Sequence, residues 1–196
     1  MTLNMLIGIL EQGLIYGIMA MGLLITYRIL DFPDLTVDSS FPLGAAVSAT
    51  LTLQGVAPWL TLLIGCAAGD NPSVVTTLSR DQGTVKILGL IIANALVALA
   101  GAVMCQQQRF FDISMGTGTM VAGLASVIIG TNLFRHASFL RTTTMVLIGS
   151  ILYKACVSIA ISFGLDAQDM KLITAVLFLA ILVLSNTRKK KVRIHA

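Results

Sequence analysis

Long apolar segments alternate with short polar stretches along the whole chain. Several of these segments exceed the roughly 18 to 20 residues that a helix needs to cross the hydrocarbon layer of a bilayer. Their Leu, Ile, Val, Ala and Met residues are interspersed with Gly, Ser and Thr, which is typical of helices packed closely in lipid. The pattern predicts an all-α, polytopic transmembrane helical bundle of about six membrane segments. The predicted segments are 5–27, 43–68, 85–105, 116–134, 145–163 and 172–186.

The composition supports a lipid environment for this single predicted transmembrane domain, 1–196. Hydrophobic residues make up 56% of the chain and charged residues 11%, whereas a soluble domain has about a quarter charged residues. The mean hydropathy is +0.91. The first residues contain neither a basic region nor a small-residue cleavage site, so we expect no cleaved signal peptide.

Basic residues gather in the connections that one orientation places in the cytoplasm. The tail 187–196 is rich in Lys and Arg, and the connections 70–86 and 135–141 also contain basic residues. The connections 28–42 and 164–171 are net acidic and fall outside. The positive-inside rule then predicts that both termini are cytoplasmic. We expect the tail to contact anionic membrane lipid, with nucleic-acid binding as the weaker alternative.

The sequence contains none of the motifs that would predict catalysis or metal binding. It has no Walker lysine loop, nucleophile elbow, paired intramembrane carboxylates or His/Cys ligand set. The three cysteines are far apart within apolar segments, and both histidines lie in basic stretches. We therefore expect no enzyme activity, cofactor or metal site on this chain.

The polar stretch 70–83 predicts a short helix between two membrane segments. Asn71 suits an N-cap, Pro72 suits the first helical position, and Gly83 can end the helix. Three apolar side chains share one face of this helix and form a ridge free to dock into a partner. The ridge consists of Val74, Val75 and Leu78. A helix lying flat on lipid is the alternative interpretation.

Three blocks of the sequence resemble a known family of transport proteins. The block 69–130, which begins GDNPSVVTTLSRDQG, resembles the permease signature of ABC importers of the branched-chain amino acid type. Within that family it is most similar to permeases of aromatic amino acid importers and of importers with unassigned solutes. The blocks 11–46 and 147–185 are similar to the first span with its following loop and to the final part of the same family.

The resemblance implies that the stretch 70–83 is the coupling helix, which rests in a groove of a separate ATPase subunit. The residues that it assigns to ATPase coupling are Asn71, Pro72, Ser73, Val74, Val75, Leu78, Arg80 and Gly83. It further implies a multi-pass protein of the bacterial cytoplasmic (inner) membrane that forms the path for a small organic solute, with an amino acid as the expected class. An extracytoplasmic solute-binding protein and a second copy of the permease are the other implied partners.

The resemblance is not continuous. Near residues 66–70 it passes from the second span of the family directly to the coupling loop, so an internal deletion relative to the family is expected there. Two alternatives to a working permease follow. One is a non-transporting, truncated permease remnant, and the other is a small secondary carrier or channel, which would need an internal ion pathway.

Two membrane segments contain single polar residues that are candidates for the translocation path. Asn94 is expected to form an interhelical hydrogen bond, with a substrate contact as the alternative. Lys154 lies near the centre of its segment, so it should face the bundle interior, a cavity or a partner. Lys154 could pair with another residue for a structural reason or take part in transport, and the sequence leaves both interpretations open.

Two polar clusters lie on the predicted outer face. In the cluster 106–119, a half-helix start could direct its N–H groups at a carboxylate or a water-filled path. The alternative is a loop with tight helix packing. Its candidate path residues are Gly116, Thr117, Gly118 and Thr119. The acidic stretch 31–42 is interpreted as an outer loop that contacts the binding protein, rather than as a metal site.

Overall fold

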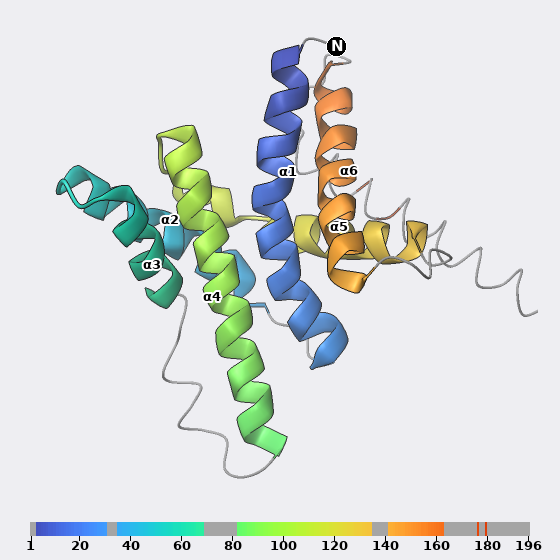
Figure 1. Cartoon of the computed structure of the whole chain (residues 1–196), viewed down its shortest axis with the longest axis horizontal. Helices are drawn as coiled ribbons and strands as arrows, with labels where there is room; N and C mark the ends of the chain where they lie inside the picture. The colour runs from blue at the N-terminus through green and yellow to red at the C-terminus, as the bar shows by residue number, and fades with distance from the viewer. Residues whose placement is uncertain are drawn as a thin grey trace, which may run out of the picture. The chain divides into compact units, whose positions relative to one another are not determined.

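The computed structural model describes residues 3–30, 35–68, 82–134 and 141–162, together with Val176 and Leu179 (Figure 1). All regular structure in these ranges is helical, which confirms the all-α prediction for this part of the chain. The elements are α1 (Leu3–Leu24), the π-helical turn η1 (Ile25–Ile29), α2 (Val37–Leu53), α3 (Pro58–Ala68), α4 (Gln82–Gln108), the 3₁₀ turn η3 (Ile113–Gly116), α5 (Thr119–Leu133) and α6 (Thr142–Ser162).

Four helical stretches in the described residues are long and apolar enough to cross a membrane. They are Leu3–Tyr27, Ile87–Gln108, Ile113–Leu133 and Thr142–Ser162. Each corresponds to one of the predicted segments, and together they fit a multi-pass membrane protein. The predicted segment 172–186 lies outside the described residues except for Val176 and Leu179, and the basic tail lies wholly outside them.

The segment 43–68, predicted as one membrane segment, is instead two helices. The 17 residues of α2 end at Leu53 and the 11 residues of α3 begin at Pro58. Gly55, at φ +80°, adopts the left-handed conformation that commonly follows a helix end. Proline suits the first position of the next helix, because its missing N–H would have no intrahelical partner there. The Gly and Pro signals therefore outweigh the apolar character of the stretch.

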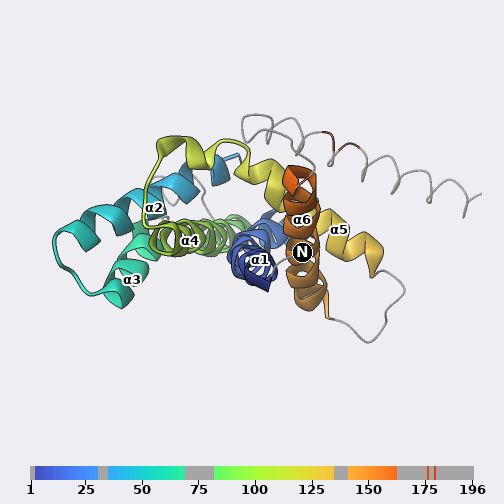
Figure 2. The same ribbon diagram turned by 90° about the horizontal axis from the view of Figure 1, so that it is seen from above.

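The chain divides into two compact units, and α2, α3 and α4 belong to the second, Ile18–Met120. In this unit α2 packs against both α3 and α4, as the view in Figure 2 also shows. The α2 and α4 backbones approach closely at two glycines. A side chain on Gly44 would collide with the Ala98 carbonyl, and one on Gly101 with the Phe41 carbonyl. Close approach at small residues is the usual means of helix association in lipid.

The first unit comprises Met1–Gly17 and Val121–Ala196, and it uses the same type of contact. Here α5 and α6 meet at a pair of glycines. A Cβ atom on Gly149 would lie only 2.6 Å from the backbone nitrogen of Gly130. Ser150 Oγ donates a hydrogen bond to the Gly13 carbonyl (2.8 Å), which joins α6 to the first half of α1.

A Gly101→Ala substitution tests the close approach of α2 and α4. The added methyl group would collide with the Phe41 carbonyl, so we expect a destabilisation of about 2 kcal/mol, typical of overpacking in a tight interface. Thermal unfolding of the purified protein in detergent measures the effect. Gly8→Ala is the matched control, because nothing lies within 4 Å of a Cβ atom there. Equal melting temperatures for the two variants would contradict this packing.

Candidate functional site

The predicted coupling helix, 70–83, lies almost entirely outside the described residues. The structure describes only its last two positions, which begin α4. Gly83 thus lies in the first turn of α4, whereas the sequence analysis placed it at the end of the preceding short helix. The other coupling residues remain predictions from the sequence.

The half-helix start predicted in the cluster 106–119 corresponds to a break in the helical structure before α5. The 3₁₀ turn ends at Gly116, Gly118 has φ +86°, and α5 begins at Thr119. Gly116 packs directly on the start of α2, because a Cβ atom there would collide with the Asp38 carbonyl and lie 2.6 Å from Pro42 Cδ. The tight-packing interpretation of this turn is thereby supported for Gly116.

The carboxylate of Asp38 caps the start of α5. Its Oδ1 atom accepts a hydrogen bond from the Met120 backbone N–H (2.7 Å) and another from the Thr119 hydroxyl (2.9 Å). A carboxylate at a helix N-terminus satisfies free backbone donors and interacts favourably with the helix dipole. The half-helix start was expected to face a carboxylate or a water-filled path. It faces a carboxylate of its own chain.

Asn94 joins α2 to α4 in the second unit. Its side-chain oxygen accepts hydrogen bonds from the hydroxyls of Thr36 (3.0 Å) and Ser40 (2.8 Å). The Asn94 side chain is buried, with 7% of its surface exposed. The predicted interhelical hydrogen bond is therefore confirmed, and the substrate contact stays a prediction.

Gln106 has a structural role that the sequence analysis missed. Its side-chain nitrogen lies within hydrogen-bonding distance of Thr61 Oγ1 (2.6 Å), the Pro58 carbonyl (3.0 Å) and Ser48 Oγ (3.2 Å). One amide at the C-terminal end of α4 thus joins α2 and α3. The available signal was a polar side chain within an apolar helix, the same signal that singled out Asn94.

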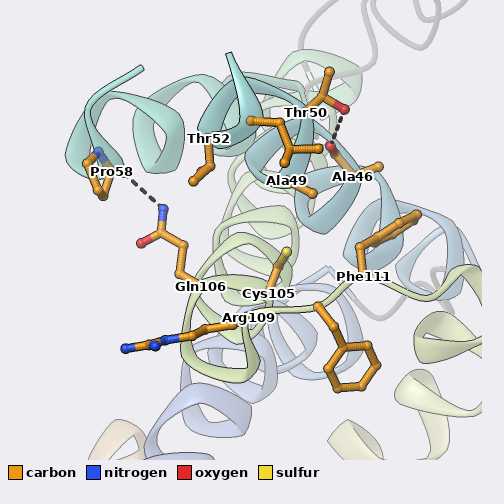
Figure 3. A pocket seen from close by; sticks show the side chains of 11 residues that line it. Ala46, Ala49, Thr50, Thr52, Pro58, Cys105, Gln106, Arg109 and Phe111 are labelled. Atoms are coloured by element: carbon orange, nitrogen blue, oxygen red, sulfur yellow. Dashed lines mark hydrogen bonds between the residues drawn. The ribbon is translucent and has the colours of Figure 1, made fainter. Parts of the chain in front are cut away.

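A hollow of about 760 Å³ lies among α2, α3 and the C-terminal end of α4 (Figure 3). It is lined by Ala46, Ala49, Thr50, Thr52, Leu53, Pro58, Cys105, Gln106, Arg109, Phe110 and Phe111. Its lining is mostly apolar, and Arg109 is the one charged residue in it. Several lining residues are exposed, so the hollow opens at the surface of the second unit. Part of the predicted cluster 106–119 therefore lines a hollow, whereas Gly116 and Thr119 pack near the start of α2.

The acidic side chain of Asp112, near this end of α4, is engaged locally. Asp112 Oδ1 accepts a hydrogen bond from the Ser114 backbone N–H (2.7 Å), and this bond lowers the pKa of the exposed Asp112 carboxyl. Among the described residues, no group of three or more His, Cys, Asp or Glu side chains could hold a metal ion.

Lys154 in the first unit has partners from α1. Its ammonium lies 3.4 Å from Gln12 Oε1 and 3.7 Å from the centre of the Tyr16 ring. These contacts confirm the expectation that Lys154 faces the packed helices, and they combine a hydrogen bond with a cation–π interaction. Lys154 also lines a smaller hollow of about 280 Å³ between α1 and α6. A transport role for Lys154 stays a prediction.

Asp38→Ala tests the cap on α5. Loss of both hydrogen bonds should destabilise the protein by about 1 to 2 kcal/mol. Asp38→Asn keeps an oxygen acceptor and should therefore destabilise the protein less than Asp38→Ala. Thermal unfolding in detergent compares the two, with Asp112→Ala as the control because Asp112 caps only a 3₁₀ turn. An unchanged melting temperature for Asp38→Ala would rule out the cap as a stabilising contact.

Comparison with known proteins supports a relation to transport permeases. Residues 5–69 match the family described as the permease component of branched-chain amino acid transport systems. The tyrosine transport system permease protein of Clostridioides difficile is 29% identical, over 92% of this chain and 91% of that protein. An uncharacterized protein of Rickettsia prowazekii is 25% identical, over 91% of this chain and 97% of the relative.

The alignment with the Clostridioides difficile permease runs over 269 residues, which is more than the 196 residues of this chain. It therefore includes positions at which this chain has no residue. No solved structure matches the chain. The family resemblance found in the sequence is confirmed, and this multi-pass membrane protein is similar to the permease components of branched-chain amino acid transport systems.

Proposed function

We propose that this chain is the membrane-spanning permease subunit of an ATP-driven ABC importer. The observation that carries the proposal is the resemblance to a tyrosine transport system permease over 92% of the chain. The four apolar helical stretches long enough to cross a membrane support it. The chain forms the translocation path, and a separate ATPase subunit supplies the energy.

The ATPase docks on the cytoplasmic segment that connects α3 to α4. This segment, 70–83, has the capping pattern of a short helix with an apolar ridge of Val74, Val75 and Leu78. An apolar ridge of this kind fits a groove on a partner. Movement of the ridge on ATP binding would reach the membrane through α4, which begins at Gln82.

The other partners follow from the same proposal. An extracytoplasmic solute-binding protein delivers the solute, and two copies of the permease enclose the path in a bacterial inner membrane. The solute is a small organic molecule of the amino acid class. Tyrosine is the first candidate to test, because the name of one relative specifies it.

The proposed path residues differ in the contacts that they make. The Asn94 oxygen and the Thr119 hydroxyl take part in contacts with residues of the α2 region. Lys154 lines the hollow between α1 and α6, and its ammonium contacts Gln12 and Tyr16 of α1. We therefore assign Lys154 the solute contact and the turn 116–119 a gating position near α2.

The proposed internal shortening lies near residues 66–70, at the end of α3. The alignment with the Clostridioides difficile permease is 269 residues long, whereas this chain has 196 residues. Such a deletion would account for the difference. A shortened permease can keep its coupling helix and still lack a complete path. Coupling and transport therefore need separate tests.

The coupling test is co-purification of this chain with its cognate ATPase from detergent. A Val74→Asp/Leu78→Asp double variant places two charges on the apolar ridge and should abolish association. Thr76→Asp/Thr77→Asp adds the same charges away from the ridge and should keep it. Failure of the unmodified chain to retain any ATPase would contradict the proposal and favour a truncated remnant or a small carrier.

Lys154→Met tests the proposed path. We expect it to lower tyrosine uptake by cells that express the complete importer, with no decrease in melting temperature. The reason is that a central lysine costs roughly 2.5 to 3.5 kcal/mol in a membrane segment, and we expect relief of this cost to outweigh the loss of the contacts with Gln12 and Tyr16. Lys154→Arg retains the charge and serves as the control. Reduced uptake together with a lower melting temperature would assign Lys154 a structural role instead.

A further inference from the structure

We propose that the hollow among α2, α3 and α4 binds an anionic phospholipid, with the lipid phosphate at Arg109 and an acyl chain along the apolar wall. The inference concerns a lipid site and does not depend on coupling to an ATPase. It requires only that the helices lie in a membrane, and it starts from the position of Arg109.

The position of Arg109 along the chain predicts that it lies at the depth of the lipid headgroups. The apolar stretch of α4 that can cross the membrane ends at Gln108, one residue before it. Basic side chains at the ends of membrane helices reach toward the headgroup region. Trp59 at the start of α3 has 63% of its surface exposed, and it follows Pro58, which lines the hollow. Exposed tryptophan is enriched at the same interface.

The wall of the hollow suits a hydrocarbon chain. Ala46 and Ala49 line it along α2, and Phe111 lines it beyond α4 (Figure 3). Leu53, the last residue of α2, also lines it. The Thr50 and Thr52 hydroxyls that also line it donate to carbonyls of their own helix, at 2.8 and 2.7 Å. These hydroxyl groups therefore already donate their hydrogen bonds within the protein and do not make the wall a set of free donors.

The Arg109 guanidinium is the charged group available to a ligand. Within the part of the chain that the structure describes, it has no hydrogen bond or ion pair through its side chain, and Arg109 is exposed. A guanidinium binds phosphate oxygens well, because its planar donors match their geometry. The positive charge of Arg109 is complementary to a lipid phosphate, whereas the apolar wall beside it offers no charged partner.

The backbone at Arg109 gives a second reason to assign a role to its side chain. Arg109 follows the end of α4 with φ 59°, and its N–H donates to the Cys105 carbonyl (2.8 Å). Glycine is favoured at this left-handed position after a helix, whereas a residue with a Cβ atom is strained there. The chain has an arginine where the backbone alone would favour glycine. This cost is compatible with a role for the Arg109 side chain beyond the helix end.

A free amino acid fits the hollow less well than a lipid. Its ammonium group would need an acidic partner, and none of the residues that line the hollow is acidic. Asp112 is close in sequence, but it does not line the hollow, and its Oδ1 atom accepts the Ser114 N–H. One basic group beside an apolar wall matches a ligand with one anionic head and an apolar tail.

Native mass spectrometry of the purified full chain tests the lipid site. The probes are phosphatidylglycerol, which is anionic, and phosphatidylcholine, which is zwitterionic. We expect the unmodified chain to retain phosphatidylglycerol preferentially. Arg109→Gly should weaken this retention roughly fivefold, as expected for the loss of one basic residue at a lipid headgroup. Without added lipid, its melting temperature should be unchanged or higher, because glycine relieves the backbone strain.

Two further variants separate the site from general effects. Arg141→Gly removes an exposed arginine at the start of α6, outside the hollow, and should leave phosphatidylglycerol retention unchanged. Ala49→Phe fills the hollow and should weaken retention of both lipids. Equal loss for Arg109→Gly and Arg141→Gly would overturn the proposal, as would full retention by Arg109→Gly. Displacement of the lipid by free tyrosine would identify an amino acid site instead.

Discussion

Close approach of helix backbones at glycine is the contact on which both units of this protein depend. In lipid, apolar side chains gain little by leaving their surroundings, so helices associate through tight packing and hydrogen bonds. The second unit achieves this at Gly44 and Gly101, and the first unit at Gly130 and Gly149. Because the backbones are close, short hydroxyl side chains can reach across. Ser40 thus donates to Asn94 on another helix, at 2.8 Å.

Polar groups within these helices mostly bind one another, and this limits what is available to a solute. Asp38 caps α5, and Gln106 joins three helices in the second unit. An unpaired polar group in an apolar environment is costly, so such contacts resist opening. A transport cycle that used these residues would have to exchange their hydrogen bonds for others. Arg109 differs, because within the described residues its side chain has no hydrogen bond or ion pair.

The sequence predicted the features that depend on local pattern. The helical class and four of the six predicted spans followed from apolar runs, and the half-helix start before α5 followed from Gly116 and Gly118. Asn94 and Lys154 were found as single polar residues in apolar helices. The Asp38 cap was not predicted, because its partner Thr119 lies 81 residues away and no local signal connects them. The division into α2 and α3 was missed because hydropathy was given more weight than Gly55 and Pro58.

Transport itself is the central claim, and uptake into proteoliposomes tests it most directly. The purified permease and its cognate ATPase would be reconstituted in vesicles, with ATP on the side of the membrane where the ATPase lies. The solute-binding protein and labelled tyrosine would be added outside the vesicles. The account predicts uptake that requires ATP hydrolysis and stops with a non-hydrolysable ATP analogue. Uptake that is equal with and without ATP would indicate a secondary carrier or channel. No uptake from an intact three-component complex would contradict a working importer and identify a remnant.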